Sequence, residues 1–354
     1  QAAIGLSGEE AYMKKFKAGV IGCGTISPMH LQSLNTVGNV ELKAVCDVNV
    51  ERAADKANRY SCNYYTDYKE MLDREGLDVV HICTPHYLHA PMAIYAANRG
   101  VNVLTEKPMA VSLQDADDMI KAAKDSQVTL GVIFQNRYNP GSVLIKNTLE
   151  SGELGRIISG RLSVVWHRSD SYYSESDWRG TWDREGGGVI INQAIHTLDL
   201  MRWFVDVPID YVEANISNRF HPGIEVEDCA EGVIFYKNGV RALFYTTTSY
   251  SYDVPVELEL HCENGLARLV ADKAVIRFDD GREVCADVDK NEVMDYGDGV
   301  KSYWGVSHCK QIRAFYESLA KGERPFIDGV EARKTQELVC AIYRSGKENR
   351  RIYL

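Results

Sequence analysis

The sequence predicts an α/β protein with an N-terminal doubly wound parallel sheet of the Rossmann type, followed by an α/β domain on a large, mostly antiparallel, open-faced sheet. Three observations predict this fold. A glycine turn, Gly22-Cys23-Gly24, follows the first apolar run; apolar runs then alternate with helical patterns to about residue 138; and strand-like runs follow one another after residue 139. We therefore expect one domain over 13–138 and a second over 139–354.

The bulk composition excludes several classes of protein. Acidic residues outnumber basic ones by 50 to 40, the net charge is −10, and the basic residues form no cluster, which argues against nucleic acid or an anionic membrane as partner. The nine scattered cysteines include no C-x-x-C pair, which favours reduced thiols in a cytoplasmic protein and no metal site. Residues 1–12 lack the apolar region of a signal peptide and are expected to be a disordered tail or a cloning remnant.

The first unit has the context of a dinucleotide-binding turn. A strand is predicted at 16–21, and Met29, Leu31 and Leu34 recur at roughly helical spacing after the turn. In the turn, Gly22 permits the tight bend, and Gly24 lets the backbone approach a pyrophosphate, whose charge the helix N-terminus favours. Thr25 and Ile26 complete this predicted site. The third position of the motif is Ser27 in place of Gly or Ala.

An acidic residue supports the same site. The next strand, 40–46, ends in Asp47, which lies 23 residues after Gly24 and suits a contact with the adenosine ribose hydroxyls. A carboxylate there would repel a 2′-phosphate, so NAD is favoured over NADP, although Arg52 nearby softens the repulsion. Asp47 can also be read as an N-cap of the helix at 51–59, and the two roles are compatible.

The rest of this domain continues the alternation of strands and helices. We expect helices at 68–74, 90–99 and 113–125 (N-cap Ser112), and strands at 77–83, 101–104 and 128–134. The strand at 101–104 runs into Glu106-Lys107-Pro108, and Thr84-Pro85 follows the strand before it. Because ligands bind at the carboxyl ends of parallel strands, three strand ends converge on one crevice. The alternative for Glu106 and Lys107 is a surface ion pair.

The second domain shows strand patterns with turns such as Lys237-Asn238-Gly239 between them. Strands are expected at 157–167, 211–220, 229–237, 240–250, 256–263, 267–271 and 275–279, with helices at 309–321 and 330–345. The open face of such a sheet is expected to form the interface of a homodimer or homotetramer.

A second group of candidate site residues follows three glycines, 186–188. The pattern from Val189 is helical and places Asn192, His196 and Asp199 on one face. Histidine is suited to moving a proton near neutral pH, and Asp199 could hold its ring. Three glycines before a helix suggest a close approach of the backbone, such as to a ligand. The alternative for His196 is a core histidine.

Aromatic and basic residues flank these glycines. Tyr172, Tyr173, Trp178 and Arg179 suit sugar faces and hydroxyl groups, with core or interface packing as the alternative. Arg137 follows the last strand of the first domain and is expected to line the same site. Tyr303 and His308 are expected to be structural.

Together, these motifs resemble the Gfo/Idh/MocA oxidoreductases. The matching residues, in the family's order and spacing, are Gly22-x-Gly24, Thr84-Pro85-x-x-x-His89, Glu106-Lys107-Pro108 and the run Gly186-Gly187-Gly188-x-x-x-Asn192-x-x-x-His196. The resemblance is dense over 16–204 and fainter over 331–345. It implies oxidation or reduction of a secondary alcohol of a sugar or cyclitol with NAD(P).

The resemblance also implies roles for individual residues. Lys107 would lie near the nicotinamide and the reacting hydroxyl, and His196 would be the general acid/base. Many members have Asp where this chain has Asn192, so a carboxylate partner for the proton step is missing, although Asn192 can still bind a substrate hydroxyl. His86 replaces an Asn often found after Thr-Pro. We expect the following residues to contact the cofactor: Gly22, Gly24, Thr25, Ile26, Asp47, Thr84, Pro85, His89, Glu106, Lys107, Trp178 and Arg179. We expect the following to contact substrate: Lys107, Arg137, Tyr172, Tyr173, Asn192 and His196.

The leading hypothesis is an NAD-dependent sugar or polyol dehydrogenase. A redox-neutral enzyme that holds NAD and oxidises a sugar transiently, as in anhydro-sugar conversion, glycoside cleavage or isomerisation, needs the same lysine and histidine and stays open. A non-catalytic ligand sensor is disfavoured because Lys107 and His196 are both present.

Overall fold

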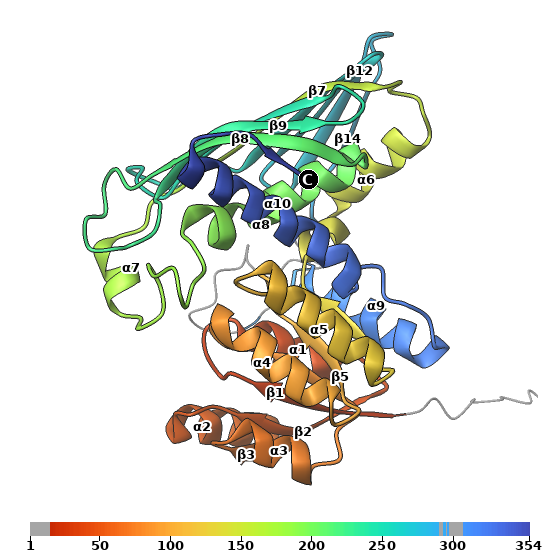
Figure 1. Cartoon of the computed structure of the whole chain (residues 1–354). Coiled ribbons are helices and arrows are strands. Elements are labelled where there is room, and N and C mark those ends of the chain that lie inside the picture. Colours follow the sequence, from red (N-terminus) through yellow and green to blue (C-terminus); the bar gives the residue numbers. More distant parts are fainter. Residues whose placement is uncertain (1–14, 290–292, 295, 297–306) are drawn as a thin grey trace, which may run out of the picture.

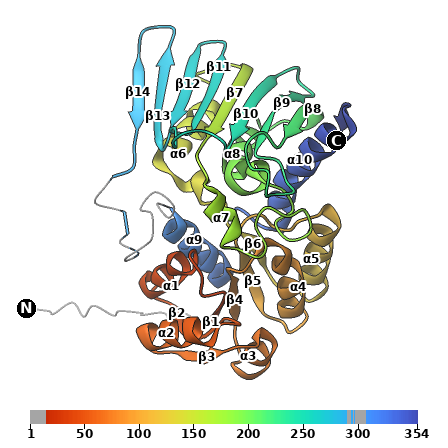
Figure 2. The same ribbon diagram turned by 90° about the vertical axis from the view of Figure 1, so that its left-hand side faces the viewer.

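The computed structural model describes residues 15–289, 293–294, 296 and 307–354. The predicted tail at 1–12 and Tyr303 lie outside the described residues. The chain forms two stacked domains, a parallel sheet with flanking helices below and a broad second sheet above (Figures 1 and 2). The predicted fold class is confirmed.

The first sheet has six parallel strands in the order β3-β2-β1-β4-β5-β6. Its elements, in chain order, are β1 Phe16–Ile21, α1 Ser27–Thr36, β2 Val40–Cys46, α2 Val50–Tyr60, β3 Asn63–Tyr65, α3 Tyr68–Arg74, β4 Val79–Ile82, α4 His86–Ala97, β5 Asn102–Thr105, α5 Leu113–Asp125 and β6 Leu130–Val132. The central strands β4 and β5 are short and almost fully buried, as expected for a sheet covered on both faces.

Helix α4 begins four residues before its predicted start. Pro85 is its N-cap, and Pro91 lies inside the helix. The prediction started the helix at Ala90, after the two histidines that the structure places in its first turn. Ser112 does cap α5, accepting a hydrogen bond from the Asp115 N–H, as predicted.

The second sheet has nine strands in the order β14-β13-β12-β11-β7-β10-β9-β8-β15. All neighbours are antiparallel except β7 and β10, which pair in parallel. The elements of this half are η1 Gln135–Tyr138, α6 Pro140–Glu150, β7 Ile157–Val165, α7 Asp170–Ser174, η2 Ile190–Ala194, α8 Ile195–Val205, β8 Ile209–Ser217, β9 Cys229–Tyr236, β10 Arg241–Thr247, β11 Glu257–Cys262, β12 Gly265–Val270, β13 Lys273–Phe278, β14 Glu283–Ala286, α9 His308–Lys321, α10 Gly329–Glu348 and β15 Ile352–Tyr353.

Helices α6, α8 and α10 cover one face of this sheet, the face toward the first domain (Figures 1 and 2). Side chains alternate along the strands, so that in β10 Ala242 and Phe244 are buried while Leu243 and Tyr245 are 54% and 42% exposed. The outer face therefore mixes apolar and charged side chains, as in a half-covered antiparallel sheet.

Helix α9 belongs structurally to the first domain, although a boundary at 138 would assign it to the second. Its residues Ile312, Phe315 and Tyr316 share a core with Phe16 and Val20 of β1. In both ribbon views α9 lies beside α1 (Figures 1 and 2). The chain thus returns to the Rossmann domain before α10 crosses back to the second sheet.

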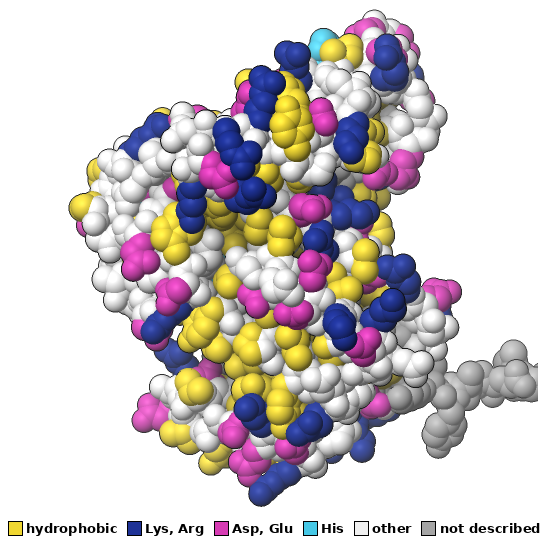
Figure 3. Space-filling model, in the orientation of Figure 1, with side chains coloured by type: hydrophobic (Ala, Val, Ile, Leu, Met, Phe, Trp, Pro, Cys, Tyr) yellow, Lys and Arg dark blue, Asp and Glu magenta, His cyan; other side chains and the backbone are white. Residues whose placement is uncertain are grey.

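The cysteines, the length of the helices and the surface charges complete the description of the fold. All nine cysteines are free thiols. Among the described residues, no helix combines the length and apolar character needed to cross a bilayer. On the face drawn in Figure 3, basic and acidic side chains are interspersed with apolar ones.

Candidate active site

The glycine turn between β1 and α1 has the shape that a dinucleotide requires. Gly22 has φ +93°, and a Cβ there would lie 2.5 Å from the Cys83 carbonyl oxygen, so only glycine fits. A Cβ on Gly24 would meet nothing within 4 Å, so the backbone is open on that side. Among the described residues, no side chain caps the start of α1, whose N-cap is Ile26, so its first N–H groups suit an anion. These residues fit a dinucleotide pyrophosphate.

Asp47 lies beside this turn, at the end of β2. Its carboxylate accepts hydrogen bonds from the Cys23 N–H (2.8 Å) and the Asn49 N–H (2.9 Å). The side-chain N-cap of α2 is Asn49, so the alternative role of Asp47 as that cap is not what the structure shows. The carboxylate therefore lies at the glycine turn, and its contact with a ribose stays a prediction.

The ends of β4 and β5 are tied together by a buried histidine. His89 Nδ1 lies 2.8 Å from the Pro108 carbonyl oxygen, and Nε2 lies 2.8 Å from the Thr84 carbonyl oxygen. With both ring nitrogens engaged and no exposed surface, His89 has no free polar atom for a cofactor. This corrects the predicted contact role: His89 positions the loops that carry Thr84 and Lys107.

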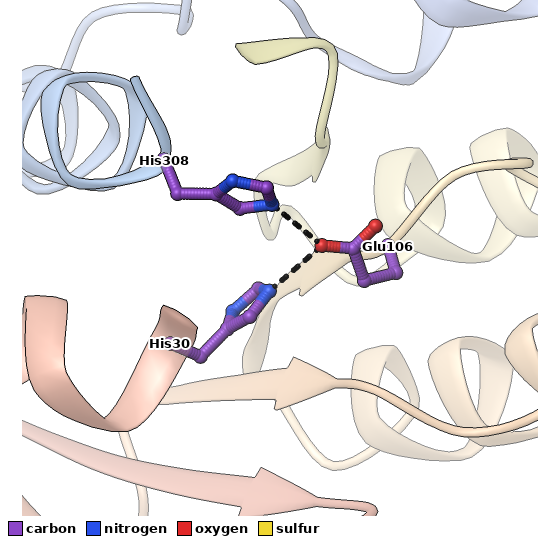
Figure 4. A group of neighbouring side chains, drawn as sticks. All are labelled: His30, Glu106 and His308. Atoms are coloured by element: carbon purple, nitrogen blue, oxygen red, sulfur yellow. Dashed lines mark hydrogen bonds and ion pairs between the residues drawn. The ribbon is translucent and has the colours of Figure 1, made fainter. Parts of the chain in front are cut away.

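Glu106 and Lys107 are not a surface pair. Glu106 Oε1 accepts hydrogen bonds from His30 Nε2 and His308 Nε2, both at 3.0 Å, and these three residues form the two-histidine cluster (Figure 4). Although burial opposes ionisation, the bonds from His30 and His308 hold the pKa of Glu106 well below its usual value. Glu106 Oε2 accepts the Lys107 N–H at 3.1 Å, so the buried carboxylate shapes the turn that presents Lys107.

The two-histidine cluster continues inward as a chain of hydrogen bonds. His30 Nδ1 lies 2.8 Å from His81 Nδ1, and His81 Nε2 lies 2.9 Å from the Tyr316 hydroxyl. Burial lowers the pKa of both His30 and His81. With neutral rings, one set of protons satisfies every contact: the Tyr316 hydroxyl donates to His81, His81 to His30, and His30 to the Glu106 carboxylate.

The same cluster is a candidate metal-binding group, since its three ligand atoms lie within 4.8 Å of one another and the donor set suits zinc. Both Nε2 atoms, however, lie at hydrogen-bond distance from one carboxylate oxygen, and binding a metal would require both to lose their protons. The proton arrangement above already satisfies the cluster's contacts with Glu106. We therefore interpret the cluster as support for Glu106, and the expectation of no metal site stays a prediction.

The three glycines of the second domain serve packing within the protein. A Cβ on Gly187 would overlap the Tyr343 hydroxyl, and a Cβ on Gly188 would overlap the Glu227 carbonyl oxygen. The backbone thus passes close to protein groups, which corrects the suggestion of a close approach to a ligand. The Glu227 carboxylate then accepts the N–H groups of Gly188 (2.9 Å) and Ile190 (3.0 Å), fixing the start of the helix.

The two domains meet where Lys107 reaches Asn192. Lys107 Nζ donates to the Asn192 carbonyl oxygen at 2.8 Å and lies 3.4 Å from its Oδ1. Asn192 sits in η2, a π-helical turn, a distortion that is frequent at functional sites. Burial lowers the pKa of Lys107, an effect that Glu106 and Glu185 oppose.

His196 lies one helical turn beyond Asn192, close to Lys107. Its Nδ1 is buried and has no hydrogen-bond partner among the residues that the structure describes. Burial, aided by the Lys107 charge, lowers the pKa of His196 to about 3. The ring is therefore neutral at physiological pH, whereas the sequence analysis expected a histidine that gains and loses a proton near neutral pH.

Asp199 does not hold the His196 ring. Its carboxylate accepts the Arg137 guanidinium in a bidentate pair, at 2.7 Å and 2.6 Å, and also the Thr335 hydroxyl at 2.6 Å. The Arg137 side chain is fully buried and donates to Glu331 as well. Arg137 therefore links helices of the protein interior, which corrects its predicted contact with substrate.

The four aromatic and basic candidates divide into two groups. The Tyr172 hydroxyl accepts hydrogen bonds from Asn192 Nδ2 (3.1 Å) and Gln193 Nε2 (3.3 Å), so it lies at the Lys107 site. Arg179 stacks over the Tyr172 ring at 4.2 Å, and the Trp178 ring lies 4.7 Å from that of His86. Tyr173 is instead buried, with its hydroxyl on Thr248, and this corrects its predicted contact with substrate.

At the domain junction, Glu185 was not among the predicted site residues, and His86 was noted only as a replacement for Asn after Thr-Pro. Glu185 is 1% exposed, and its Oε1 accepts the Asn192 amide at 2.6 Å. His86 donates from Nδ1 to the Glu185 carbonyl oxygen at 2.8 Å. Only the position of Glu185 before the glycines offered a signal, because an acid that will be buried has no distinctive local pattern.

A Rossmann sheet with an open glycine turn, joined through a lysine to a helix of a second sheet domain, defines a two-domain nucleotide-binding enzyme. Comparison with family models agrees: the NAD-binding Rossmann fold of an oxidoreductase family matches residues 16–134, and the GFO/IDH/MocA C-terminal domain matches 143–268. The chain belongs to the Gfo/Idh/MocA family of oxidoreductases.

Several relatives have assigned activities. Inositol 2-dehydrogenase of Salmonella typhimurium is 29% identical over 267 residues, which is 73% of this chain and 76% of that protein. D-apiose dehydrogenase of Paraburkholderia graminis is 27% identical over 361 residues, 99% of this chain and 92% of that protein. Among solved structures, the WlbA dehydrogenase from Bordetella pertussis, in complex with NADH and UDP-GlcNAcA, has a TM-score of 0.84 at 29% identity and covers 96% of this chain and 99% of its own.

Proposed function

We propose that this protein is an NAD-dependent dehydrogenase acting on a secondary alcohol, or the matching ketone, of a sugar, sugar derivative or cyclitol. The observation that carries the proposal is the 2.8 Å contact between Lys107 Nζ, at the carboxyl edge of the Rossmann sheet, and Asn192 of the second domain. An amine there is positioned beside the space that a nicotinamide occupies in a Rossmann domain. The names of the relatives support the substrate class.

The residues present can divide the work of the reaction. A bound nicotinamide supplies hydride transfer to or from the carbinol carbon. The Lys107 ammonium binds the reacting oxygen and stabilises negative charge on it. His196, a partly exposed neutral ring close to Lys107, accepts the hydroxyl proton. Tyr172 and Asn192 orient the neighbouring hydroxyl groups of the substrate.

NAD is the proposed cofactor because the Asp47 carboxylate occupies the ribose end of the glycine turn. Its two hydrogen bonds to backbone N–H groups hold it in place beside Cys23. A 2′-phosphate would meet this negative charge, whereas ribose hydroxyls can donate to it.

We also propose that the uncovered face of the nine-stranded sheet forms the subunit interface of a homodimer or homotetramer. Leu243, Tyr245 and Tyr353 are 54%, 42% and 65% exposed. The exposed ion pair Arg161–Glu259 lies beside Leu243 on the two central strands, so such an interface would include charged as well as apolar side chains. Light scattering after gel filtration tests this, with Leu243→Glu expected to shift the oligomer toward monomer.

One experiment tests the function. Ligands released from freshly purified protein are identified by mass spectrometry, and a panel of sugars, nucleotide sugars and cyclitols is then assayed with NAD at the absorbance of the reduced nicotinamide. Net formation of NADH supports the dehydrogenase. Substrate conversion without an absorbance change, with NAD retained on the protein, would support redox-neutral turnover instead.

Two variants test the residue roles. Lys107→Ala and His196→Ala should each lower kcat by about 10²–10⁴-fold with unchanged far-UV circular dichroism. Lys273→Ala and His261→Ala, on exposed residues of β13 and β11, are matched controls expected to keep wild-type turnover. Wild-type turnover in either active-site variant would contradict the role assigned to that residue.

A further inference from the structure

The side-chain amide of Asn192 bridges a cation and a buried carboxylate. Its Oδ1 faces Lys107 Nζ at 3.4 Å, and its Nδ2 donates to Glu185 Oε1 at 2.6 Å. The opposite amide orientation would place NH₂ against the ammonium and oxygen against the carboxylate, so chemistry fixes the orientation. Lys107 is thereby connected to a carboxylate through one amide group.

Glu185 is held firmly in this position. Its Oε2 accepts the Gly180 N–H at 2.5 Å, and its main-chain carbonyl oxygen accepts His86 Nδ1 from α4 of the first domain. The Tyr87 N–H also donates to the Arg184 carbonyl oxygen at 3.1 Å, so the Rossmann domain fixes the backbone that carries Glu185. The residue is 1% exposed.

The charge of Glu185 is sensitive to its surroundings. Burial raises its pKa to about 7, opposed by the hydrogen bonds from Gly180 and Asn192. The described titratable and charged groups that face it are Lys107, Tyr172, Tyr173, Arg179, Glu227 and Tyr343. His86, whose pKa burial lowers well below its usual value, contacts it as a neutral ring.

We propose that Glu185 is a positioning residue for the reaction, which supplies through the Asn192 amide the carboxylate that the sequence lacks next to Lys107. This rests on the proposed function of Lys107. An ionised Glu185 anchors the amide, and the amide oxygen holds the ammonium toward the substrate position. A protonated Glu185 removes the counter-charge, so the Lys107 amine binds its proton less tightly. The pKa of Lys107 and the kcat of the enzyme therefore both depend on the protonation state of Glu185.

A purely structural role for Glu185 is the competing interpretation, since it also binds the Gly180 N–H. Glu227 offers a matched control. It is likewise a buried acid whose pKa burial raises to about 7, but its carboxylate binds Gly188, Ile190 and the Tyr343 hydroxyl, not Asn192. Loss of a buried carboxylate as such would affect the two positions alike.

A charge relocation tests the proposal in the NAD-loaded enzyme. Glu185→Gln removes the carboxylate, and Asn192→Asp places a second one against Glu185, where the two must share a proton. Each single variant should lower kcat at least about tenfold, with a smaller change in KM. The double variant, with one carboxylate moved next to Lys107, should recover most of that loss.

The pH profile gives an independent readout. In the wild-type enzyme, kcat should change with pH near neutrality as Glu185 titrates. This limb of the pH profile should be absent in Glu185→Gln. It should be present in Glu227→Gln, a variant that should chiefly lose stability. A double variant no better than the worse single variant, or a limb unchanged in Glu185→Gln, would overturn the proposal.

A measurement without substrate separates this proposal from the proposed function. Competitive acetylation of the protein across pH, read by mass spectrometry on the Lys107 peptide, reports the pKa of that amine. The pKa should fall by about one unit in Glu185→Gln and return in the double variant. An unchanged Lys107 pKa would refute the coupling even if no sugar were turned over, whereas absent turnover with the expected shift would count against the dehydrogenase alone.

Discussion

Substitution of alanine for the two glycines of the dinucleotide turn should change the free energy of unfolding of the apoprotein by very different amounts. In Gly22→Ala, the methyl group would lie 2.5 Å from the Cys83 carbonyl oxygen, at φ +93°. Positive φ costs about 1–3 kcal/mol, and overlap with backbone that cannot rotate away costs about 1–3 kcal/mol more. A loss of about 2–6 kcal/mol in the free energy of unfolding follows. In Gly24→Ala, the methyl group meets nothing within 4 Å, so the apoprotein should change by no more than about 0.5 kcal/mol.

Gly24→Ala should weaken NAD binding, although it leaves the stability of the apoprotein almost unchanged. If a pyrophosphate lies against the open side of Gly24, the added methyl group weakens NAD binding at least about tenfold. At an NAD concentration about 100 times the wild-type Kd, the stabilisation by ligand would then fall from about 2.7 to about 1.4 kcal/mol. Urea unfolding with and without NAD, together with calorimetric titration, measures both quantities. Wild-type NAD affinity in Gly24→Ala would show that the cofactor lies elsewhere and refute the reasoning.

Three further predictions concern single charged side chains. Arg137→Met should destabilise the protein by about 3–5 kcal/mol in urea unfolding, because the buried Asp199 carboxylate loses its bidentate partner and keeps only Arg202, at 3.6 Å, as a basic neighbour, while KM for substrate stays unchanged. Asp47→Ser should raise the kcat/KM ratio of NADP to NAD at least about tenfold; an unchanged ratio would remove Asp47 from the ribose contact. Glu227 has a folded-state pKa raised to about 7, above its unfolded value, so the folded state binds the proton more tightly and stability falls as pH rises from about 4.5 to 7. Glu227→Gln should flatten that slope in unfolding titrations, and a slope equal to wild type would contradict it.

Local patterns were sufficient to predict the elements of the fold. The strands at 16–21 and 40–46 and the helices at 68–74 and 113–125 have the predicted bounds, because each is a compact run of one periodicity ended by a glycine, a cap or a charge. Three short strands, β3, β14 and β15, were missed, since a few partly exposed residues carry little periodic signal.

The placement of polar side chains was harder to predict than the elements. Arg137 and Asp199 are 62 positions apart, and nothing near either one indicates that it will be buried against the other. Sequence position therefore suggested two residues of the site, whereas long-range packing made them an internal ion pair. Glu185 shows the converse, since its importance depends on the domain junction and not on its neighbours in the chain.

Many polar groups are buried near the junction of the two domains because directional hydrogen bonds are needed to fix the position of Lys107. The Lys107 amine, just after a Rossmann strand, and the main-chain carbonyl oxygen of Asn192, 85 residues later, lie 2.8 Å apart although they belong to different domains. Apolar packing alone sets such a distance loosely, because it is not directional. Hydrogen bonds to His89, Glu106 and Glu227 are directional, and each holds one loop or helix end that carries a site residue. Burying these polar side chains costs free energy. Their hydrogen bonds in turn fix the geometry of the domain junction on both sides of Lys107.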